Sequence, residues 1–296
     1  MEEWKSEDGN IELYNGDCLD VMQWLIDNNV KVDAIITDPP YQTTACKWDT
    51  LISFNKHITT TRGRSKKLIP MYEDEWVMRE LETTDKSIHQ CREEFEKNCK
   101  EGMWDKLNKL IKPNGAIVLF GSEPFSSALR MSNIKNYKYD WIWNKKNTGC
   151  PVVAKKRPLP IHENISVFAL NKASYYPIKT DLHIEREWKQ YKNSESIPIA
   201  NPSSGKTKGK YPKTILQEFS NANRKGKAHP TQKPVALMEY LIKTYTNESE
   251  LILDFTAGSF TTSVASDNTN RKSIGIELES KYFDIGINRM RSENTI

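Results

Sequence analysis

The chain alternates short apolar runs with stretches of helical periodicity, and this alternation constrains its fold more than any other feature. Four runs have the length and continuous apolar character of buried parallel strands, and each ends in a polar or glycine-containing turn. They are Val32–Thr37, Ala116–Phe120, Leu251–Asp254 and Ser273–Glu277. Helical stretches fall around them at Leu19–Asn28, Gly102–Ile111, Pro234–Tyr245 and Thr261–Asp267. The alternation predicts an α/β fold with a doubly wound, mostly parallel sheet.

Positive charges gather in two parts of the chain, although the net charge is only +4. Between 145 and 160 every charged residue is a cation, and between 201 and 228 the cations are opposed by Glu218 alone. Such clusters suit a polyanionic partner, because each phosphate contact releases counterions. Basic runs are also common in solvated surface loops, which is the alternative interpretation. The candidate residues for contact with such a partner, DNA among the possible polyanions, are Lys155, Lys156, Arg157, Lys206, Lys208 and Lys210.

Two segments interrupt the alternation, so we expect a single domain over residues 1–296 with two insertions. The length exceeds the usual size of one domain, and the hydrophobic content of 37% suffices for one core. Residues 54–100 are rich in charge, and 73–100 predict one or two exposed helices that form a lid or face DNA. Residues from about 145 to 227 hold prolines, the basic clusters and a low-complexity run at 201–205. They predict a loop-rich target-recognition region rather than another βα layer.

The cysteines and the start of the chain bear on the compartment. Five scattered cysteines without a CxxC pair argue against a zinc site or a disulfide framework and fit a reducing cytosol. The first residues lack the apolar region of a signal peptide, and no apolar run approaches membrane-spanning length. We therefore expect a cytoplasmic protein with no bound metal and no membrane partner.

The segment Leu251–Thr262 predicts a strand, a tight turn and the start of a helix. Small residues at Ala257, Gly258 and Ser259 allow a ligand to approach the backbone, and a helix N-terminus offers N–H groups to a carboxylate. Glu277 ends the next strand, where Rossmann-like sites bind ribose hydroxyls. A loop with one glycine and no pyrophosphate cradle favours a nucleoside that carries an amino-acid tail. A purely structural turn is the alternative interpretation.

The tetrapeptide Asp38-Pro39-Pro40-Tyr41 follows the strand Val32–Thr37 directly, and ligands of open α/β sheets bind beyond the carboxyl ends of strands. Its composition suits the methylation of an exocyclic base amine, whose lone pair is delocalised into the ring. If Asp38 and the Pro39 carbonyl each accept one N–H, the lone pair is directed at a sulfonium methyl group. The prolines stiffen the loop, and Tyr41 offers a surface on which a flipped base can stack. Taken alone, the tetrapeptide could equally be a proline-rich turn.

Together these motifs resemble the DNA amino-methyltransferases of the β group, in which the catalytic motif precedes the cofactor motif. The closest match is to adenine methyltransferases of phages and restriction systems. The resemblance spans nearly the whole chain and implies a Rossmann-like S-adenosylmethionine-dependent methyltransferase fold. It rests on Asn15–Cys18, Asp38–Tyr41, Trp48-Asp49, Gly121–Phe125, the segment from His229 to Pro234, Asp254–Thr262 and Ile274–Leu278.

The resemblance implies S-adenosylmethionine as cofactor and a role for each matched residue. Asp17 and Cys18 would lie against the cofactor's adenine, and Glu277 would hold its ribose. Lys233 and the hydroxyls of Thr261 and Thr262 would meet the methionine carboxylate. The other implied cofactor-binding residues are Asp38, Asp254, Phe255, Thr256, Ala257, Gly258, Ser259 and Leu278, and the implied catalytic residues are Asp38, Pro39, Pro40 and Tyr41.

One position departs from the family pattern. Phe260 stands where the family usually has a further glycine. A bulky side chain there must point away from the cofactor or it would block the site. We therefore expect activity to survive, while the affinity for the cofactor is the property that this residue puts in question.

The resemblance also orders the candidate functions. Aspartate at the head of the tetrapeptide favours N6 of adenine in double-stranded DNA, and N4 of cytosine is the alternative because the amine chemistry is the same. Methylation of RNA or of a protein amide fits the motif order and the basic insertion less well. A non-catalytic DNA-binding protein with a decayed cofactor pocket has Phe260 as its only support. A homodimer and a cognate restriction endonuclease are the partners that the resemblance suggests.

Overall fold

A nine-stranded mixed sheet forms the centre of the computed structural model, which describes residues 1–41, 52–62, 67–147, 151–189, 204–220 and 232–293. The strand order is β1-β2-β13-β12-β3-β6-β8-β7-β11. The bounds are β1 Glu2–Lys5, β2 Ile11–Asn15, β3 Val32–Thr37, β6 Ile111–Gly121, β7 Tyr137–Asn144, β8 His162–Phe168, β11 Ile215–Leu216, β12 Leu251–Asp254 and β13 Lys272–Glu277. Within the described residues of this sheet, antiparallel pairing is confined to β1–β2, β6–β8 and β7–β8, so the expected α/β fold with a mostly parallel sheet is confirmed.

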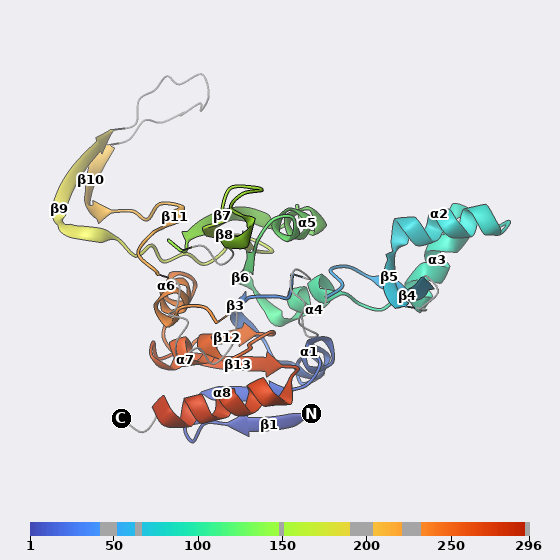
Figure 1. Ribbon diagram of the computed structural model, residues 1–296, viewed down its shortest axis with the longest axis horizontal. Helices are drawn as coiled ribbons and strands as arrows, with labels where there is room; N and C mark the ends of the chain where they lie inside the picture. The colour runs from blue at the N-terminus through green and yellow to red at the C-terminus, as the bar shows by residue number, and fades with distance from the viewer. Residues whose placement is uncertain (42–51, 63–66, 148–150, 190–203, 221–231, 294–296) are drawn as a thin grey trace.

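Helices cover both faces of this sheet, as doubly wound folds require. On one face, α1 (Cys18–Asp27), α4 (Met103–Leu110) and α5 (Phe125–Ser132) bury one apolar cluster against the strands. On the other face lie α6 (Val235–Tyr245), α7 (Thr261–Asp267) and α8 (Ser280–Glu293). Figure 1 shows α1 and α4 on one side of the sheet and α6 and α7 on the other. The central strands are therefore buried on both faces, which explains their continuous apolar sequence.

The predicted elements match this core closely. Strands β3 and β12 and helix α7 have the predicted bounds, while β6 and β13 begin earlier than the apolar runs Ala116–Phe120 and Ser273–Glu277. Helices α1, α4 and α6 each agree with the predicted stretch to within one residue at either end. The sequence did not predict the outer strands β1, β2, β7, β8 and β11 or the helices α5 and α8. These elements are polar on one side, so their apolar residues do not form continuous runs.

The first insertion forms a small lobe beside the sheet, which projects to the right in Figure 1. It contains the antiparallel pair β4 (His57–Arg62) and β5 (Lys67–Tyr72), then α2 (Glu73–Thr83) and α3 (Ile88–Asn98). Two helices lie within 73–100, where the sequence predicted one or two, and the two strands were not expected. The lobe has its own cluster of buried residues, made of Met71, Trp76, Val77, Cys91 and Phe95. Its role as a lid or a DNA-facing surface stays a prediction.

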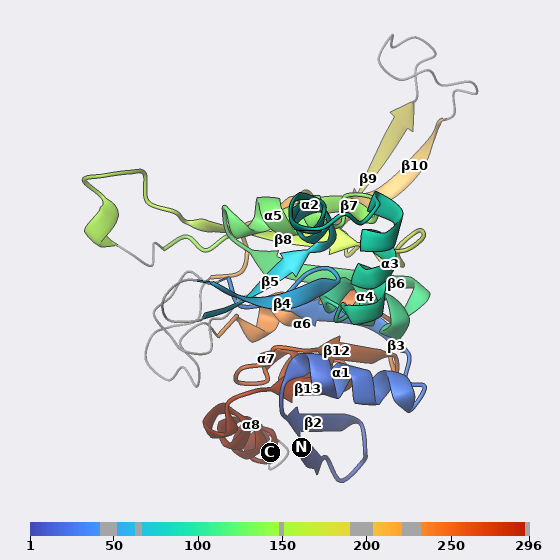
Figure 2. The same cartoon turned by 90° about the vertical axis from the view of Figure 1, so that its right-hand side faces the viewer.

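The second predicted insertion is not a continuous excursion from the sheet, which corrects its boundaries. Strand β8 lies within residues 145–227 and pairs with both β6 and β7 in the central sheet. The sequence hid this strand because it opens with the polar residues His162, Glu163 and Asn164. What leaves the core is the segment after β7, described at 145–147 and 151–161 and here called the 145–161 loop, and a two-stranded ribbon of β9 (Thr180–Lys189) and β10 (Ser204–Lys210). Figure 2 shows them on opposite sides of the molecule.

Candidate active site

A pocket lies at the carboxyl ends of β3, β12 and β13, where open α/β sheets bind their ligands. It receives side chains from the turn before α1, the loop after β3, the residues before α6, the β12–α7 loop and the end of β13. Every residue predicted to bind the cofactor lines this pocket: Asp17, Cys18, Asp38, Lys233, Asp254, Phe255, Thr256, Ala257, Gly258, Ser259, Thr261, Thr262, Glu277 and Leu278. Residues that were not predicted to bind the cofactor also line it: Gly16, Pro40, Ile52, Gln232, Met238 and Ile276.

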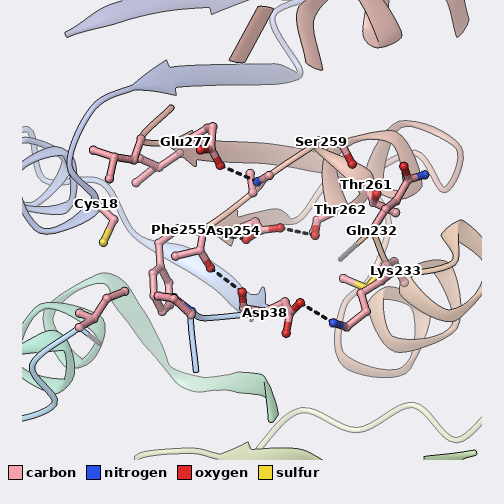
Figure 3. Close-up of a pocket in the computed structure, with 18 of the residues that line it drawn as sticks. Cys18, Asp38, Gln232, Lys233, Asp254, Phe255, Ser259, Thr261, Thr262 and Glu277 are labelled. Atoms are coloured by element: carbon pink, nitrogen blue, oxygen red, sulfur yellow. Dashed lines mark hydrogen bonds and ion pairs between the residues drawn. The ribbon is translucent and has the colours of Figure 1, made fainter. Parts of the chain in front are cut away.

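Asp254 holds the two loops of the pocket together. Its carboxylate accepts hydrogen bonds from the Thr37 hydroxyl at 2.5 Å, from the Thr256 N–H at 3.2 Å and from the Thr262 hydroxyl. The Thr256 hydroxyl in turn donates to the Asp38 carbonyl at 3.2 Å, as Figure 3 shows. Burial raises the pKa of Asp254 to about 6 against these stabilising donors. Asp254 therefore fixes the β3 and β12 ends relative to each other, and Thr37 is a positioning residue that the sequence did not indicate.

Glu277 closes the opposite end of the pocket. Its Oε2 accepts the Gly258 N–H and its Oε1 accepts the Glu279 N–H, both at 2.8 Å. Burial raises the pKa of this carboxyl to about 7. A carboxylate oxygen has two lone pairs, so each oxygen can still accept a ligand hydroxyl. Asp17, which also lines the pocket, caps α1 by accepting the Leu19 N–H at 2.8 Å.

Phe260 points away from the pocket, as the sequence required. Its ring is fully buried in the cluster formed by α7 and α8, with the Phe283 ring 6.2 Å away between centroids. The backbone at Phe260 is left-handed, with φ of +56°, a conformation that glycine adopts without strain. Gly275 and Gly286 leave the space for the ring, since a Cβ at Gly286 would lie 1.9 Å from the ring atom Cδ2. The pocket is thus not blocked by Phe260.

Four charged side chains meet at the loop after β3. The Lys233 ammonium contacts Asp38 Oδ2 and lies 3.3 Å from Glu163 Oε2. Lys145 donates to Glu163 Oε1 at 3.0 Å, and the Tyr41 hydroxyl donates to Asp38 Oδ1. In Figure 3 the Asp38 and Lys233 side chains point toward each other across the pocket. The sequence did not indicate Glu163 or Lys145, because neither belongs to a recognisable motif.

The pKa shifts in this cluster favour the ionised forms of Lys233 and Glu163. Burial raises the pKa of Asp38, and Glu163 adds to this effect while Lys233 opposes it. Burial acts to lower the pKa of Lys233, but the charges of Asp38 and Glu163 outweigh it and raise that pKa. Burial likewise acts to raise the pKa of Glu163, and Lys233 with Lys145 holds it below its ordinary value. Of the two carboxyl groups in the cluster, Asp38 is therefore the one whose ionised form is less stabilised.

Comparison with known proteins decides the family. The model of a DNA methylase family of N6 and N4 methyltransferases matches residues 32–288, which include both loops of the pocket. The chain belongs to this family. It is therefore an S-adenosylmethionine-dependent DNA methyltransferase, and the pocket is the candidate cofactor site.

Individual relatives resemble this methyltransferase at low identity. The type II methyltransferase M.HpaI of Haemophilus parainfluenzae is 26% identical over 278 residues, which cover 88% of this chain and 69% of that protein. The DNA adenine methyltransferase YhdJ of Escherichia coli (strain K12) is 26% identical over 196 residues, which cover 62% of this chain and 63% of that protein. The crystal structure of the M1.HpyAVI–SAM complex superposes with a TM-score of 0.56 at 23% identity, covering 95% of this chain and 98% of that one. This last likeness confirms the fold.

Several residues predicted for the methyltransferase site keep their status as predictions. Pro39 and Tyr41 do not line the cofactor pocket, and the Tyr41 ring packs on Phe125 with centroids 4.9 Å apart. Lys233 reaches the pocket, but the contacts described for its ammonium are to Asp38 and Glu163. Its role at the methionine carboxylate therefore stays a prediction. The motif residues at 48–49 and 229–231 lie outside the described residues.

The two predicted DNA-binding clusters of the methyltransferase differ in their surroundings. Lys155, Lys156 and Arg157 are exposed just after the short helix η1 (Pro151–Val153), and within the described ranges they form no ion pair. On the ribbon, Lys206 lies 3.7 Å from Glu187, and Lys210 lies 2.5 Å from Asp181. Carboxylates of β9 therefore offset part of the charge of β10. The loop cluster is the stronger candidate for phosphate contact.

Proposed function

We propose that this enzyme transfers a methyl group to the exocyclic N6 of adenine in double-stranded DNA, with the target base flipped out of the helix. The observation that carries the proposal is the position of Asp38, which lines the cofactor pocket at the end of a central strand. A target amine that reaches Asp38 therefore lies beside the methyl donor. Flipping is required because a base stacked in a duplex cannot enter a pocket in the protein.

The pocket suits S-adenosylmethionine in its donors and acceptors. Glu277 presents two carboxylate oxygens for ribose hydroxyls, and the turn before α1 places Asp17 and Cys18 beside it. Thr261, Thr262 and Lys233 line the other part of the pocket and can donate hydrogen bonds to a carboxylate. The cofactor supplies an electrophilic methyl group on a sulfonium sulfur. These residues would hold it with that group near the Asp38 loop.

The residues of the Asp38 loop act by alignment and by accepting hydrogen bonds. Asp38 would accept one N–H of the target amine and the Pro39 carbonyl the other, which turns the nitrogen lone pair toward the methyl group. The Thr256 hydroxyl braces the loop through the Asp38 carbonyl, and Pro39 is buried. Prolines remove N–H groups that would compete for these acceptors. The rate enhancement then comes from orientation and electrostatic stabilisation.

Adenine is favoured over cytosine by two observations. The tetrapeptide begins with aspartate, and one relative that matches a long part of the chain is named a DNA adenine methyltransferase. The family itself includes both N6 and N4 methyltransferases, so N4 of cytosine is the alternative target. RNA or protein amides are less favoured, because the family is one of DNA methylases.

The setting of the reaction is proposed from the relatives. M.HpaI is a type II methyltransferase, which suggests a restriction–modification system with a cognate endonuclease. Such an enzyme would act in the cytoplasm, and a homodimer is the proposed assembly. Across the described part of the chain, no helix has the length and apolar character needed to cross a membrane.

Product analysis tests the proposed function directly. The purified protein is incubated with tritiated S-adenosylmethionine and a long unmethylated duplex, and the DNA is then digested to nucleosides. The expected product is labelled N6-methyldeoxyadenosine. Label in N4-methyldeoxycytidine would replace adenine by cytosine. Cofactor binding without any label in DNA would indicate a non-catalytic DNA-binding protein.

A further inference from the structure

Glu163 has a buried carboxylate oxygen that can accept a further hydrogen bond. Its Oε1 accepts a hydrogen bond from Lys145, while Oε2 is buried and has no hydrogen bond within the described residues. The Lys233 ammonium lies 3.3 Å from this Oε2 and is hydrogen-bonded to Asp38. A small movement of Nζ would therefore complete a hydrogen bond to Glu163. Lys233 thus has two carboxylate partners within reach, Asp38 and Glu163.

The same contacts limit what Asp38 can accept. Its Oδ1 accepts the Tyr41 hydroxyl and its Oδ2 accepts Lys233, while Asp254 adds a like charge from the neighbouring strand. A target amine needs a lone pair of Asp38 and a carboxylate rich in charge. If the Lys233 ammonium pairs with Asp38 alone, it occupies a lone pair of Asp38 and withdraws negative charge from the carboxylate. If the ammonium is shared with Glu163, it withdraws less charge from Asp38.

We propose that Glu163 is a positioning residue for methyl transfer, which draws the Lys233 ammonium from Asp38 Oδ2 so that this oxygen can accept the target amine. The proposal rests on the proposed DNA amine methylation and holds for adenine and cytosine alike. Lys145 helps to keep Glu163 ionised. The positive charge of the buried Lys233 is therefore paired with a carboxylate whether its ammonium lies against Asp38 or against Glu163. Loss of both anions would leave a buried charge unpaired, which proteins avoid at high energetic cost.

The rate of single-turnover methyl transfer, measured over about pH 5 to 9, tests this role. The acid limb of this pH–rate profile, where the rate falls at low pH, reports the ionisation of the accepting carboxylate. Glu163→Gln removes the charge that raises the pKa of Asp38 and leaves Lys233 to Asp38 alone. We expect the acid limb to move to lower pH by about half a unit. The plateau rate should also fall by about tenfold, because Lys233 then pairs with Asp38 alone and withdraws charge from the accepting carboxylate. Glu163→Asp retracts the charge by one methylene and should shift the limb in the same direction by less.

The controls separate this role from a structural one. Glu239→Gln removes a carboxylate on α6 that accepts a hydrogen bond from the Asn268 side chain outside the pocket, and it should leave the pH profile unchanged. An unmoved acid limb in both Glu163 variants, even with a lower rate, would overturn the proposal. If Glu163→Gln does not fold, Glu163→Asp decides alone by the same criterion. Methyl transfer by the unaltered enzyme shows whether the proposed function itself holds.

Discussion

At the residue scale, the proposed chemistry depends on keeping one carboxylate reactive inside a buried cluster. Asp38 lies between Tyr41 and Lys233, and it lines the pocket proposed for the methyl donor. In the proposed reaction its oxygens accept an N–H from the target base. The surrounding charges would then have to stabilise Asp38 without occupying it fully, which we propose is a balance between Lys233 and Glu163.

Replacing Asp38 by Asn should remove methyl transfer while leaving the cofactor in place. Asparagine keeps the size of the side chain but has one acceptor oxygen and no charge, so the amine loses its electrostatic partner. We expect the single-turnover rate to fall by about 10²-fold or more. Rapid-quench assays measure the rate, and isothermal titration measures cofactor affinity. A rate near that of the unaltered enzyme would remove Asp38 from the mechanism.

The ionisation of Glu277 should make cofactor affinity depend on pH. Its pKa is raised to about 7 in the free protein, and ribose hydroxyls that donate to the carboxylate would lower that pKa in the complex. Binding then favours the deprotonated form, so affinity should rise with pH. Between pH 6 and 8 the dissociation constant should fall by about tenfold.

Titration calorimetry at the two pH values measures this change, and Glu277→Gln is the comparison. The variant should bind more weakly and lose most of the pH dependence in this range. A variant that keeps the full dependence would assign the titration to another group, such as Asp254, whose pKa of about 6 lies lower.

The sequence indicated the residues that line the pocket because motifs place them at strand ends. Asp38 directly follows one buried strand and Glu277 ends another, so their shared edge of the sheet follows from the parallel order. Glu163 and Lys145 could not be found in this way. They reach Asp38 through Lys233, which lies 195 positions from it along the chain, and no spacing rule predicts such a contact.

At the scale of elements, α7 and α8 show how a departure from the family pattern is accommodated. Phe260 fills the space between them in a left-handed conformation that costs roughly 1–2 kcal/mol. Gly286 on α8 and Gly275 on β13 lack the side chains that would collide with the ring. The cost in backbone strain is offset by burial of a whole aromatic side chain. Phe260 and Gly286 should therefore be energetically coupled.

A double-mutant cycle between Phe260 and Gly286 measures that coupling. Gly286→Ala alone should destabilise the protein by about 1–2 kcal/mol, because its Cβ meets the ring. Phe260→Gly relieves the strain but empties a buried site, with a net loss of roughly 2–3 kcal/mol. In the Phe260→Gly background, Gly286→Ala should instead stabilise α8 by up to about 1 kcal/mol through helix propensity. Urea unfolding gives the free energies, and equal effects of Gly286→Ala in both backgrounds would contradict the coupling.

The elements that the sequence predicted are those buried on both sides. Strands β3 and β12 are continuous apolar runs, so their type and bounds follow from hydrophobicity alone. Strand β8 opens with His162, Glu163 and Asn164, of which Glu163 belongs to the charged cluster and Asn164 donates to Asp140. These polar residues removed the apolar signal by which the strand would have been recognised.

At the scale of the whole molecule, topology places a basic loop beside the active site. Strand β7 is antiparallel to β8, which is antiparallel to β6, so β7 runs in the same direction as β6 and β3. Residues 145–147, where the 145–161 loop begins, therefore leave the sheet at the same edge as the Asp38 loop. Lys145 at its base contacts Glu163 of the charged cluster. DNA that delivers a base to Asp38 would pass close to this loop, whereas Figure 2 shows the ribbon of β9 and β10 on the far side.

Neutralising the loop cluster should therefore weaken DNA binding more than neutralising the ribbon. The triple variant with Lys155, Lys156 and Arg157 changed to Gln should lower the slope of log affinity against log salt by up to about 3, since each phosphate contact contributes about 0.9. The matched variant changes Lys206, Lys208 and Lys210 to Gln. It should alter the slope less, because Lys206 and Lys210 already lie near carboxylates of β9. Fluorescence anisotropy with a labelled duplex at several salt concentrations gives both slopes. A larger change for the ribbon variant would place the phosphate backbone along β10 and reverse the assignment of the two surfaces.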